Sequence, residues 1–296
     1  MEKNIKDTLE KYVNNVEKWL LNYSLKPELK LSGTVADAMD YSLEAGGKRI
    51  RPVLVQAFCE LFGGKAEDTV SPASAIEMIH TFSLIHDDLP CMDDDDYRRG
   101  KPSCHKQFSE ACAVLAGDAL AIRPFQIIAD DNNLSAETKV KLISELSYSS
   151  GAQGMIGGQI IDMENEERDN VDEKNLREMY ALKTGMLIKT ACVMGCITAG
   201  ASEEQIEKVK EYAHCLGLAF QIIDDILDVT ADEAVLGKPT GSDADENKTT
   251  FVTLFGVEKA KAEAEELTKK ALEILDGFSG SEFLKGLTEY LLVRDY

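Results

Sequence analysis

The chain has 296 residues, 44% of them hydrophobic, and a formal net charge of −21. A chain of this length and composition can bury a sizeable core. The acidic balance argues against a general nucleic-acid-binding or membrane-surface protein, which would need a basic face. Anionic small ligands stay possible, because local basic clusters and bound cations can reverse the sign of the field inside one cleft.

Three features indicate a cytoplasmic protein without stable membrane association. The seven cysteines show neither CxxC nor Cys/His zinc spacing, which is typical of a reducing compartment. The N-terminus, MEKNIKDTLEKYVNN, has no apolar signal segment. The longest apolar run, residues 190–201, falls short of the roughly 20 residues that a membrane helix needs.

The first segments of the chain predict helices separated by turns. Glycines at 46–47 and 63–64 bracket one helix, and Pro52 suits its first turn. Ser71 is the expected N-cap of the next helix, with Pro72 at the first helical position, and this helix runs to about Asp88. Pro90 ends it by disfavouring helical geometry at the residue before. The aspartates that follow, residues 93–96, therefore lie on a loop just past a helix C-terminus.

The later segments continue the helical pattern. We expect a helix from about Ser103, and helices capped by Ser135, by Asp172, and by Ser202 with Gln205 as a capping box. Residues 236–250 form a polar Gly/Pro loop, and the chain is helical from 258 with a break near 277. Neither a strand pattern nor a linker composition interrupts residues 1–296. We therefore expect a single all-α domain, a bundle of long apolar helices.

Two groups of aspartates stand out from this helical pattern. They are Asp87, Asp88 and Asp93 in the first group and Asp224, Asp225 and Asp228 in the second. The first and last members of the second group are four residues apart, which places them on one helix face about 6 Å apart. Apolar sequence flanks this group on both sides, so its carboxylates require a cation.

The donor types indicate which cation this is. An EF-hand loop counted from Asp93 would need Glu at its twelfth position, where the chain has Cys104. Neither group contains His or Cys, which disfavours zinc. Oxygen ligation with few protein donors favours Mg²⁺, which keeps waters and shares itself with substrate phosphates.

Basic residues recur near these aspartates. They are Lys48, Arg49, Arg51, Arg98, Arg99, Lys183, Lys238 and Lys248. Each one alone is consistent with surface charge, except Lys183, which has apolar neighbours on both sides. Beside two aspartate groups of the Mg²⁺ type, they indicate a diphosphate-binding cleft.

His80 lies on the helix that ends at the first aspartate group. Asp87 follows seven residues later, so both lie near one helix face, about 10.5 Å apart along the axis. His80 alone is typical of a satisfied core histidine. The stripe His80–Ser83–Asp87 supports the alternative of a helix face that lines a cleft, with metal ligands at its mouth.

These motifs resemble the trans-isoprenyl diphosphate synthases and, within them, the bacterial farnesyl diphosphate synthases. HDDLPCMDDDDYRRGKPSCH and FQIIDDILD are similar to the two aspartate-rich motifs of that family, and GGKRIRP, AGDAL, GMIGGQIIDM, ALKTG and LGKPTGSD follow in the expected order. The resemblance covers essentially the whole chain. It implies about ten core helices around a deep central cavity, usually in a homodimer.

The resemblance also implies roles for individual residues. The Mg²⁺ ligands would be Asp87, Asp93 and Asp224, for three expected ions, with Asp88 and Asp228 in support. The allylic diphosphate would be held by Arg98, Lys183, Thr184, Gln221, Lys238 and Lys248. Isopentenyl diphosphate would be held by Lys48, Arg51, His80 and Arg99. The aspartates, Lys183 and Lys238 would act in catalysis, a head-to-tail prenyl transfer.

The same resemblance implies that Phe82 closes the product pocket at fifteen carbons. Helical angle alone does not aim Phe82 at the growing chain, and Ser83 is better aligned with Asp87. We expect farnesyl diphosphate as the product. Alternatives are a geranylgeranyl diphosphate synthase and a non-catalytic partner subunit, whereas DDILD together with GGKRIRP argues against a terpene cyclase. The expected partners are small-molecule isoprenyl diphosphates and a second copy of the chain, without nucleic acid.

Overall fold

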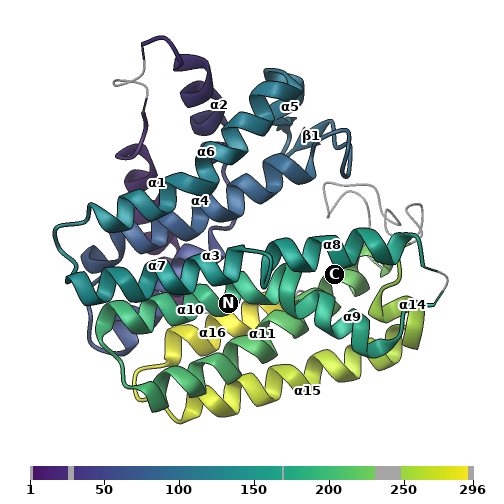
Figure 1. Ribbon diagram of the computed structural model, residues 1–296. Helices are drawn as coiled ribbons and strands as arrows, with labels where there is room; N and C mark the ends of the chain where they lie inside the picture. Colours follow the sequence, from purple (N-terminus) through teal and green to yellow (C-terminus); the bar gives the residue numbers. More distant parts are fainter. Residues whose placement is uncertain (1–2, 26–29, 169, 231–247, 293–296) are drawn as a thin grey trace.

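The computed structural model describes residues 3–25, 30–168, 170–230 and 248–292, and in these ranges almost all regular structure is helical (Figure 1). The helices of the first half are α1 (Lys3–Leu21), α2 (Gly33–Leu43), α3 (Ile50–Leu61), η1 (Ala66–Thr69), α4 (Val70–Asp87), α5 (Cys104–Gln107) and α6 (Glu110–Ala129). Those of the second half are α7 (Ala136–Ser150), α8 (Met155–Glu166), α9 (Glu173–Tyr180), the π-helical turn η2 (Ala181–Gly185), α10 (Met186–Ala199), α11 (Glu203–Thr230), α14 (Phe251–Phe255), α15 (Val257–Asp276) and α16 (Glu282–Leu292).

Side-chain caps begin three of the helices at the predicted places. Ser135 Oγ accepts a hydrogen bond from the Thr138 amide at 3.1 Å, and Asp172 Oδ1 accepts one from the Asn175 amide at 2.8 Å. Ser202 and Gln205 cap α11 reciprocally. These bonds satisfy amide groups that have no partner within the helix, which is why the capping residues locate the helix starts.

Two predicted helix starts were wrong. The helix expected from Ser103 is divided into the short α5 and the long α6, and Ser109 caps α6 by accepting from the Cys112 amide at 3.1 Å. The helix expected to follow an N-cap at Ser71 begins instead at Val70, directly after the 3₁₀ turn η1. The Ser71 hydroxyl donates instead to Asp131 Oδ2 at 2.6 Å. The Ser71 hydroxyl thus binds a distant carboxylate and does not cap the helix.

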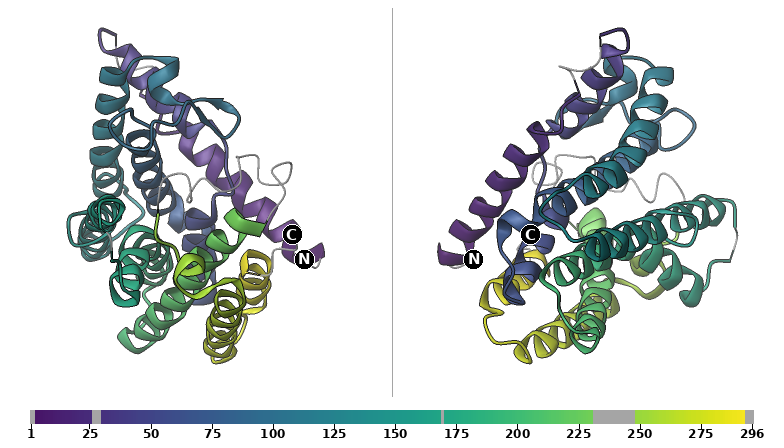
Figure 2. Two further views of the ribbon diagram at one scale, coloured as in Figure 1. Left: turned by 90° about the vertical axis from the view of Figure 1, so that its right-hand side faces the viewer. Right: turned by 60° about the vertical axis from the view of Figure 1, so that its left-hand side comes forward.

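The helices pack as a bundle, which confirms the predicted all-α fold class. Contacts are most extensive between α4 and α6, between α3 and α10, and between α11 and α15, and α15 borders one side of the bundle in Figure 1. Helix α1 runs along the outside of the bundle (Figure 2) and contacts α3, α4 and α16. Fully buried Leu, Ile, Phe and Met side chains fill the interior. Burial of this apolar surface drives the packing.

The described residues include one pair of very short strands, a feature that the sequence did not predict. Strand β1 (Tyr97–Arg98) pairs antiparallel with β2 (Lys101–Pro102). Arg99 and Gly100 form the two-residue turn between them, with φ values of 55° and 74°. A turn with both central residues in the left-handed region matches the twist of a hairpin. It sends the neighbouring arginines Arg98 and Arg99 to different parts of the molecule.

Two helices are long and apolar enough to cross a membrane, by length and composition alone. They are α6 and the continuous stretch Glu173–Ala199. In the second, most of the apolar window is buried within the bundle, as in a core helix. Neither helix contains an uninterrupted apolar run of this length, because single charged residues divide each one, and neither was therefore predicted from the sequence. The absence of stable membrane association stays a prediction.

Candidate active site

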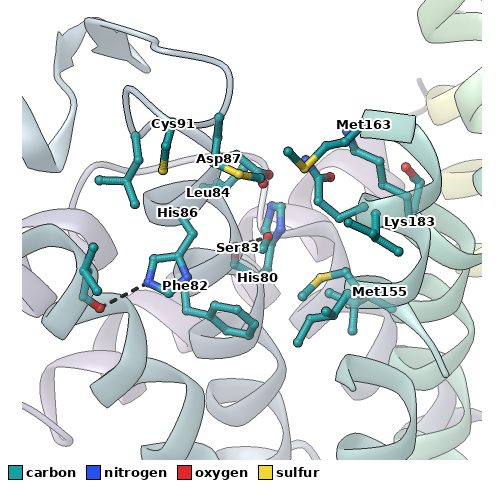
Figure 3. Close-up of a pocket in the computed structure, with 18 of the residues that line it drawn as sticks. His80, Phe82, Ser83, Leu84, His86, Asp87, Cys91, Met155, Met163 and Lys183 are labelled. Carbon is teal, nitrogen blue, oxygen red and sulfur yellow. Dashed lines mark hydrogen bonds between the residues drawn. The ribbon is translucent and has the colours of Figure 1, made fainter. Parts of the chain in front are cut away.

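Helices α4, α6 and α8 and the turn η2 enclose a cavity of about 590 Å³ (Figure 3). Most of its wall is apolar, with Phe82 and Leu187 among the lining residues. Its polar lining groups include Asp87, Lys183, Thr184, His80 and Arg51. A concave, mainly apolar site with a few converging polar groups is the usual form of a small-molecule binding site.

The loop after α4 folds back on the end of that helix. The Asp93 amide donates to the Asp87 carbonyl oxygen at 2.9 Å, which brings the first and last members of the predicted metal group together. Asp88 is buried and accepts hydrogen bonds from the Arg98 guanidinium, including one from Nε at 2.8 Å. Arg98 also binds Asp95 Oδ2 at 2.9 Å. In this structure Asp88 and Arg98 thus hold the hairpin against the helix end.

The environment of Asp87 disfavours the charged form of its carboxyl group. Burial raises the pKa of its carboxyl to about 6, with the neighbouring charges of Asp93 and Asp88 adding to the shift. The positive charges of Lys183 and Arg98 oppose it without cancelling it. A partly buried carboxyl that is disfavoured as an anion, with like charges beside it, fits a site that binds an added cation.

Lys183 lies on the π-helical turn η2, on the opposite wall of the cavity from Asp87 (Figure 3). Its Nζ binds Asp162 Oδ2 on α8 at 2.5 Å. Helix α8 approaches η2 closely at Gly158, where a Cβ atom would overlap the main chain of Lys183. π-Helical turns often mark functional sites because they redirect side chains within a helix. The glycine and the π turn together aim Lys183 into the cavity.

Asp162 was not among the predicted site residues. It lies in GMIGGQIIDM, a segment quoted for its resemblance but given no role. An acidic residue within an apolar helix was the signal that identified Asp224, and the same signal was present here. Asp162 is buried, so its carboxylate requires the charge of Lys183.

Two predicted allylic-site residues from different helices meet in the structure. Thr184 Oγ1 on η2 donates to Gln221 Oε1 on α11 at 2.9 Å, and Gln221 Nε2 donates to Asp225 Oδ1 at 3.3 Å. Asp225 is buried and also accepts from the Tyr180 hydroxyl at 2.5 Å and from the Phe251 amide at 2.9 Å. Asp225 therefore anchors the start of α14 and differs in role from its neighbours in the sequence.

Asp224 and Asp228 occupy successive turns of α11, as the four-residue spacing predicted. The Asp224 carboxylate acts electrostatically on Arg51, which lines the cavity from α3. The second aspartate group is thus linked to the cavity through Arg51, whereas Asp224 and Asp228 are not among the residues that line it. The assignment of Asp87, Asp93 and Asp224 as metal ligands stays a prediction.

Four arginines from two distant segments act on His80. Burial first, and then the positive charges of Arg51, Arg99, Arg49 and Arg98, lower the pKa of the His80 imidazole well below its ordinary value of 6.5. His80 is therefore neutral at pH 7, with one donor and one acceptor nitrogen. This concentration of positive charge in a chain of net charge −21 is what an anionic ligand requires.

The arginines of GGKRIRP divide into two kinds. Arg49 is buried and binds Glu17 Oε1 at 2.7 Å, Glu77 Oε1 at 2.6 Å and the Leu43 carbonyl at 2.5 Å. Each of its three guanidinium nitrogens therefore has a partner within the protein. The Nε of Arg51 is buried and has no hydrogen-bond acceptor among the described residues, and burial lowers the pKa of the Arg51 guanidinium. Arg51 thus retains binding capacity toward the cavity.

Arg99 extends from the turn of the hairpin to the glycines of GGKRIRP. Its guanidinium donates to the Gly46 carbonyl and packs on Gly47, where a Cβ atom would overlap it. Lys48, the next residue along, is exposed and lines a separate hollow between α1 and α16. The structure thus places Arg51, His80 and Arg99 within one electrostatic group, with Lys48 at its border.

The other predicted residues lie farther from the cavity or outside the described part. Lys248 Nζ lies 3.8 Å from Glu166 Oε1, at the end of α8. Lys238 lies outside the described residues. Asp94, Asp96 and His105, none of them predicted ligands, offer ligand atoms within 4.8 Å of one another, and Asp96 is ion-paired with Lys106 at 2.6 Å.

Comparison with known proteins shows matches over nearly the whole chain. The family described as Polyprenyl synthetase matches residues 33–289. A geranylgeranyl pyrophosphate synthase of chloroplasts from Catharanthus roseus is 45% identical over 264 residues, which are 88% of this chain and 74% of that protein.

Solved structures give the same result. An FPP/GFPP synthase from Zymomonas mobilis in its apo form has a TM-score of 0.88 and 36% identity, covering 99% of this chain and 100% of that one. A geranyltransferase from Helicobacter pylori, solved with magnesium and isoprenyl diphosphate, has a TM-score of 0.83 and 34% identity, covering 97% of this chain and 96% of that one.

Proposed function

The chain belongs to the polyprenyl synthetase family, the trans-isoprenyl diphosphate synthases, and we propose on this basis that it joins isopentenyl diphosphate head to tail to an allylic diphosphate. The observation that carries this proposal is the cavity itself. Asp87 and Lys183 face each other across an apolar chamber, which is also lined by Arg51 and His80. Such a site can bind two anions and enclose a hydrocarbon chain.

The allylic diphosphate would bind between the aspartate groups and η2. The carboxylates of Asp87, Asp93 and Asp224 are hard oxygen donors that fit Mg²⁺, and we expect three ions, with Asp88 and Asp228 in support. When bound, Mg²⁺ supplies positive charge that stabilises the diphosphate leaving group. The H. pylori geranyltransferase, solved with magnesium and isoprenyl diphosphate, supports magnesium as the ion.

Protein groups would complete the allylic site. Lys183 presents its ammonium to the cavity, and the hydroxyl of Thr184 is held by Gln221. These groups orient the diphosphate and stabilise the charge that develops as the C–O bond breaks. Arg98, Lys238 and Lys248 stay proposed members of this site.

Isopentenyl diphosphate would bind to the group formed by Arg51, His80 and Arg99, with Lys48 at its border. The neutral His80 can donate one hydrogen bond to a phosphate oxygen. Arginine is suited to phosphate because its planar guanidinium donates in a fixed fork. The separation of this site from the aspartate groups would present the double bond of one substrate to C1 of the other.

The reaction then balances without an added base. The allylic C–O bond breaks and its electron pair leaves with the diphosphate, while the double bond of isopentenyl diphosphate forms a new C–C bond to the allylic C1. A proton is lost from the resulting cation, and we assign it to the released diphosphate. The apolar walls keep water from the cation.

We propose farnesyl diphosphate as the main product, because the buried Phe82 ring forms part of the cavity wall. A second candidate, geranylgeranyl diphosphate, is favoured by the names of the curated relatives, which are geranylgeranyl pyrophosphate synthases. Product length is therefore the first property to measure. We also propose a cytoplasmic homodimer. A non-catalytic partner subunit is the alternative of a different class.

The test is incubation of the purified chain with Mg²⁺, isopentenyl diphosphate and geranyl diphosphate, followed by chromatographic sizing of the products. We expect prenyl transfer that stops when the metal is chelated. Absence of any longer product would contradict the enzymatic proposal and favour the partner-subunit alternative. As a binding control, Mg²⁺ together with an allylic bisphosphonate should raise the melting temperature, as linkage requires for a native-state ligand.

A further inference from the structure

The wall of the cavity between α4 and α6 is built from Phe82 and His86, two rings one helical turn apart. Their centroids are 5.8 Å apart and their planes meet at 74°, an edge-to-face contact. Both rings line the cavity, as does Val114 on α6 (Figure 3). Contacts between aromatic rings prefer such an edge-to-face orientation.

The imidazole of His86 is held from the side of α6. Its Nε2 lies 3.1 Å from the Val114 carbonyl oxygen, drawn as the dashed line in Figure 3. A carbonyl oxygen can only accept, so Nε2 carries the proton of this hydrogen bond. The bond fixes the tautomer and the plane of the ring.

Gly117, three residues after Val114 on the same helix, leaves the space that the ring occupies. A Cβ atom at this position would overlap Nε2, Cδ2 and Cε1 of His86. Helices α4 and α6 pack closely along their length, so neither backbone can easily retreat. Gly117 thus forms a notch in α6 into which the imidazole fits.

We propose that His86, seated in the notch at Gly117, is a specificity-determining residue that fixes the Phe82 ring across the cavity and thereby sets the product length. This inference rests on the proposed prenyl transfer and on Phe82 as the limit of the cavity. Helical geometry alone does not aim Phe82 at the growing chain. The contact with His86 supplies the missing constraint, because a Phe ring without it could rotate away from a longer chain.

Two substitutions at His86 test the ring itself. His86→Ala removes the ring that supports Phe82, and we expect the share of product one isoprene unit longer than wild type to rise roughly tenfold, the scale of a one-group change in an apolar pocket. His86→Phe keeps a ring of similar size without the Val114 hydrogen bond. It should retain most of the wild-type product length. The matched control is His105→Ala, a buried histidine on α5 that does not line the cavity.

A double-mutant cycle tests the notch. Gly117→Ala forces the imidazole toward the cavity, and we expect a lower melting temperature and shorter products. Removing the ring relieves the overlap, so Gly117→Ala/His86→Ala should regain much of the lost melting temperature. The non-additive part measures the coupling of the two positions. If Gly117→Ala does not fold, recovery of a folded protein in the double variant shows the same coupling between the two positions.

The outcomes separate this inference from the proposed function. If Phe82→Ala lengthens the product whereas His86→Ala does not, Phe82 limits the chain without His86 and the inference is overturned. If the effects of Gly117→Ala and His86→Ala on the melting temperature are additive, the two positions are not coupled and the inference is also overturned. If neither Phe82→Ala nor His86→Ala changes the product, the proposed role of Phe82 fails. If the wild-type chain transfers no prenyl group, the proposed function itself fails.

Discussion

Lys183 Nζ and Asp162 Oδ2 lie 2.5 Å apart, where helix α8 meets the π-helical turn η2. The pair links the basic residue of ALKTG to an aspartate that the sequence had left without a role. Asp162 is buried, and its carboxylate holds the lysine ammonium at the wall of the cavity. This relationship makes Asp162 a positioning residue for the proposed allylic site.

Substitution of Asp162 should therefore affect substrate use before it affects the fold. In Asp162→Asn the amide cannot compensate the ammonium, and we expect kcat/KM for the allylic substrate to fall about 10–100-fold, as for other residues that orient an active group. Steady-state kinetics with geranyl diphosphate measures the change. The matched control is Glu164→Gln on the same helix, which loses an exposed ion pair with Arg168 and should keep wild-type kinetics.

Removal of either aspartate group should abolish turnover without unfolding the protein. Asp87→Ala or Asp224→Ala loses a proposed metal ligand, and we expect turnover to fall by orders of magnitude while the helical circular dichroism is retained. Asp130→Ala, an exposed aspartate after α6, is the control. Near-wild-type turnover in both ligand variants would remove the argument for metal bridging.

The pKa of Asp87, raised to about 6 by burial and then by its acidic neighbours, predicts the pH dependence of metal binding. Below this pKa the carboxyl is protonated and cannot ligate, so Mg²⁺ affinity should fall as pH falls through 6. The same shift means that the metal-free folded state binds more protons than the unfolded state between the two pKa values. Its contribution to stability should therefore be lost as pH rises through 6.

Isothermal titration calorimetry between pH 5 and pH 7.5, together with urea unfolding of the metal-free protein, checks both signs. Asp87→Asn should remove this part of the pH dependence from each measurement. A Mg²⁺ affinity that stays constant across the range would contradict the assignment of Asp87 as a ligand.

Arg49 and Arg51 should respond differently to the same substitution. Arg49→Met leaves Glu77 buried without its partner, and we expect the free energy of unfolding to fall by about 3–5 kcal/mol, as for other broken buried ion pairs. Arg51→Met should mainly raise KM for isopentenyl diphosphate. Urea denaturation and steady-state kinetics of the two variants separate the effects. Equal loss of stability in both would contradict the division of roles.

Local sequence signals predicted the helices well where the cause is local. Ser135, Asp172 and Ser202 cap their helices with their own side chains, so sequence neighbours suffice to identify them. The starts near Ser71 and Ser103 were wrong because a tertiary contact or a second helix changed the local choice. The hairpin at Arg99–Gly100 was missed because two-residue strands carry no periodic pattern.

In the candidate site, too, some features follow from local sequence and others depend on tertiary contacts. The spacing of the aspartates, the apolar context of Lys183 and the helical stripe of His80 are properties of the chain itself, and they sufficed to indicate a diphosphate cleft. The engagement of Asp88 by Arg98, the pairing of Lys183 with Asp162 and the structural use of Arg49 depend on which helices meet. These pairs join residues 10, 21 and 28 positions apart, beyond the reach of any local rule.

The sequence by itself thus determined the all-α class and the chemistry of the site, because helical periodicity, capping and the types of charged residue act over a few neighbours. Only the tertiary structure decided which charged residues are used within the protein and which face the cavity. It also decided how Phe82 is held, because Gly117 and His86 meet only when α6 packs on α4. Packing brings distant residues within contact distance, and burial then makes each unpaired charge or misplaced methyl group costly.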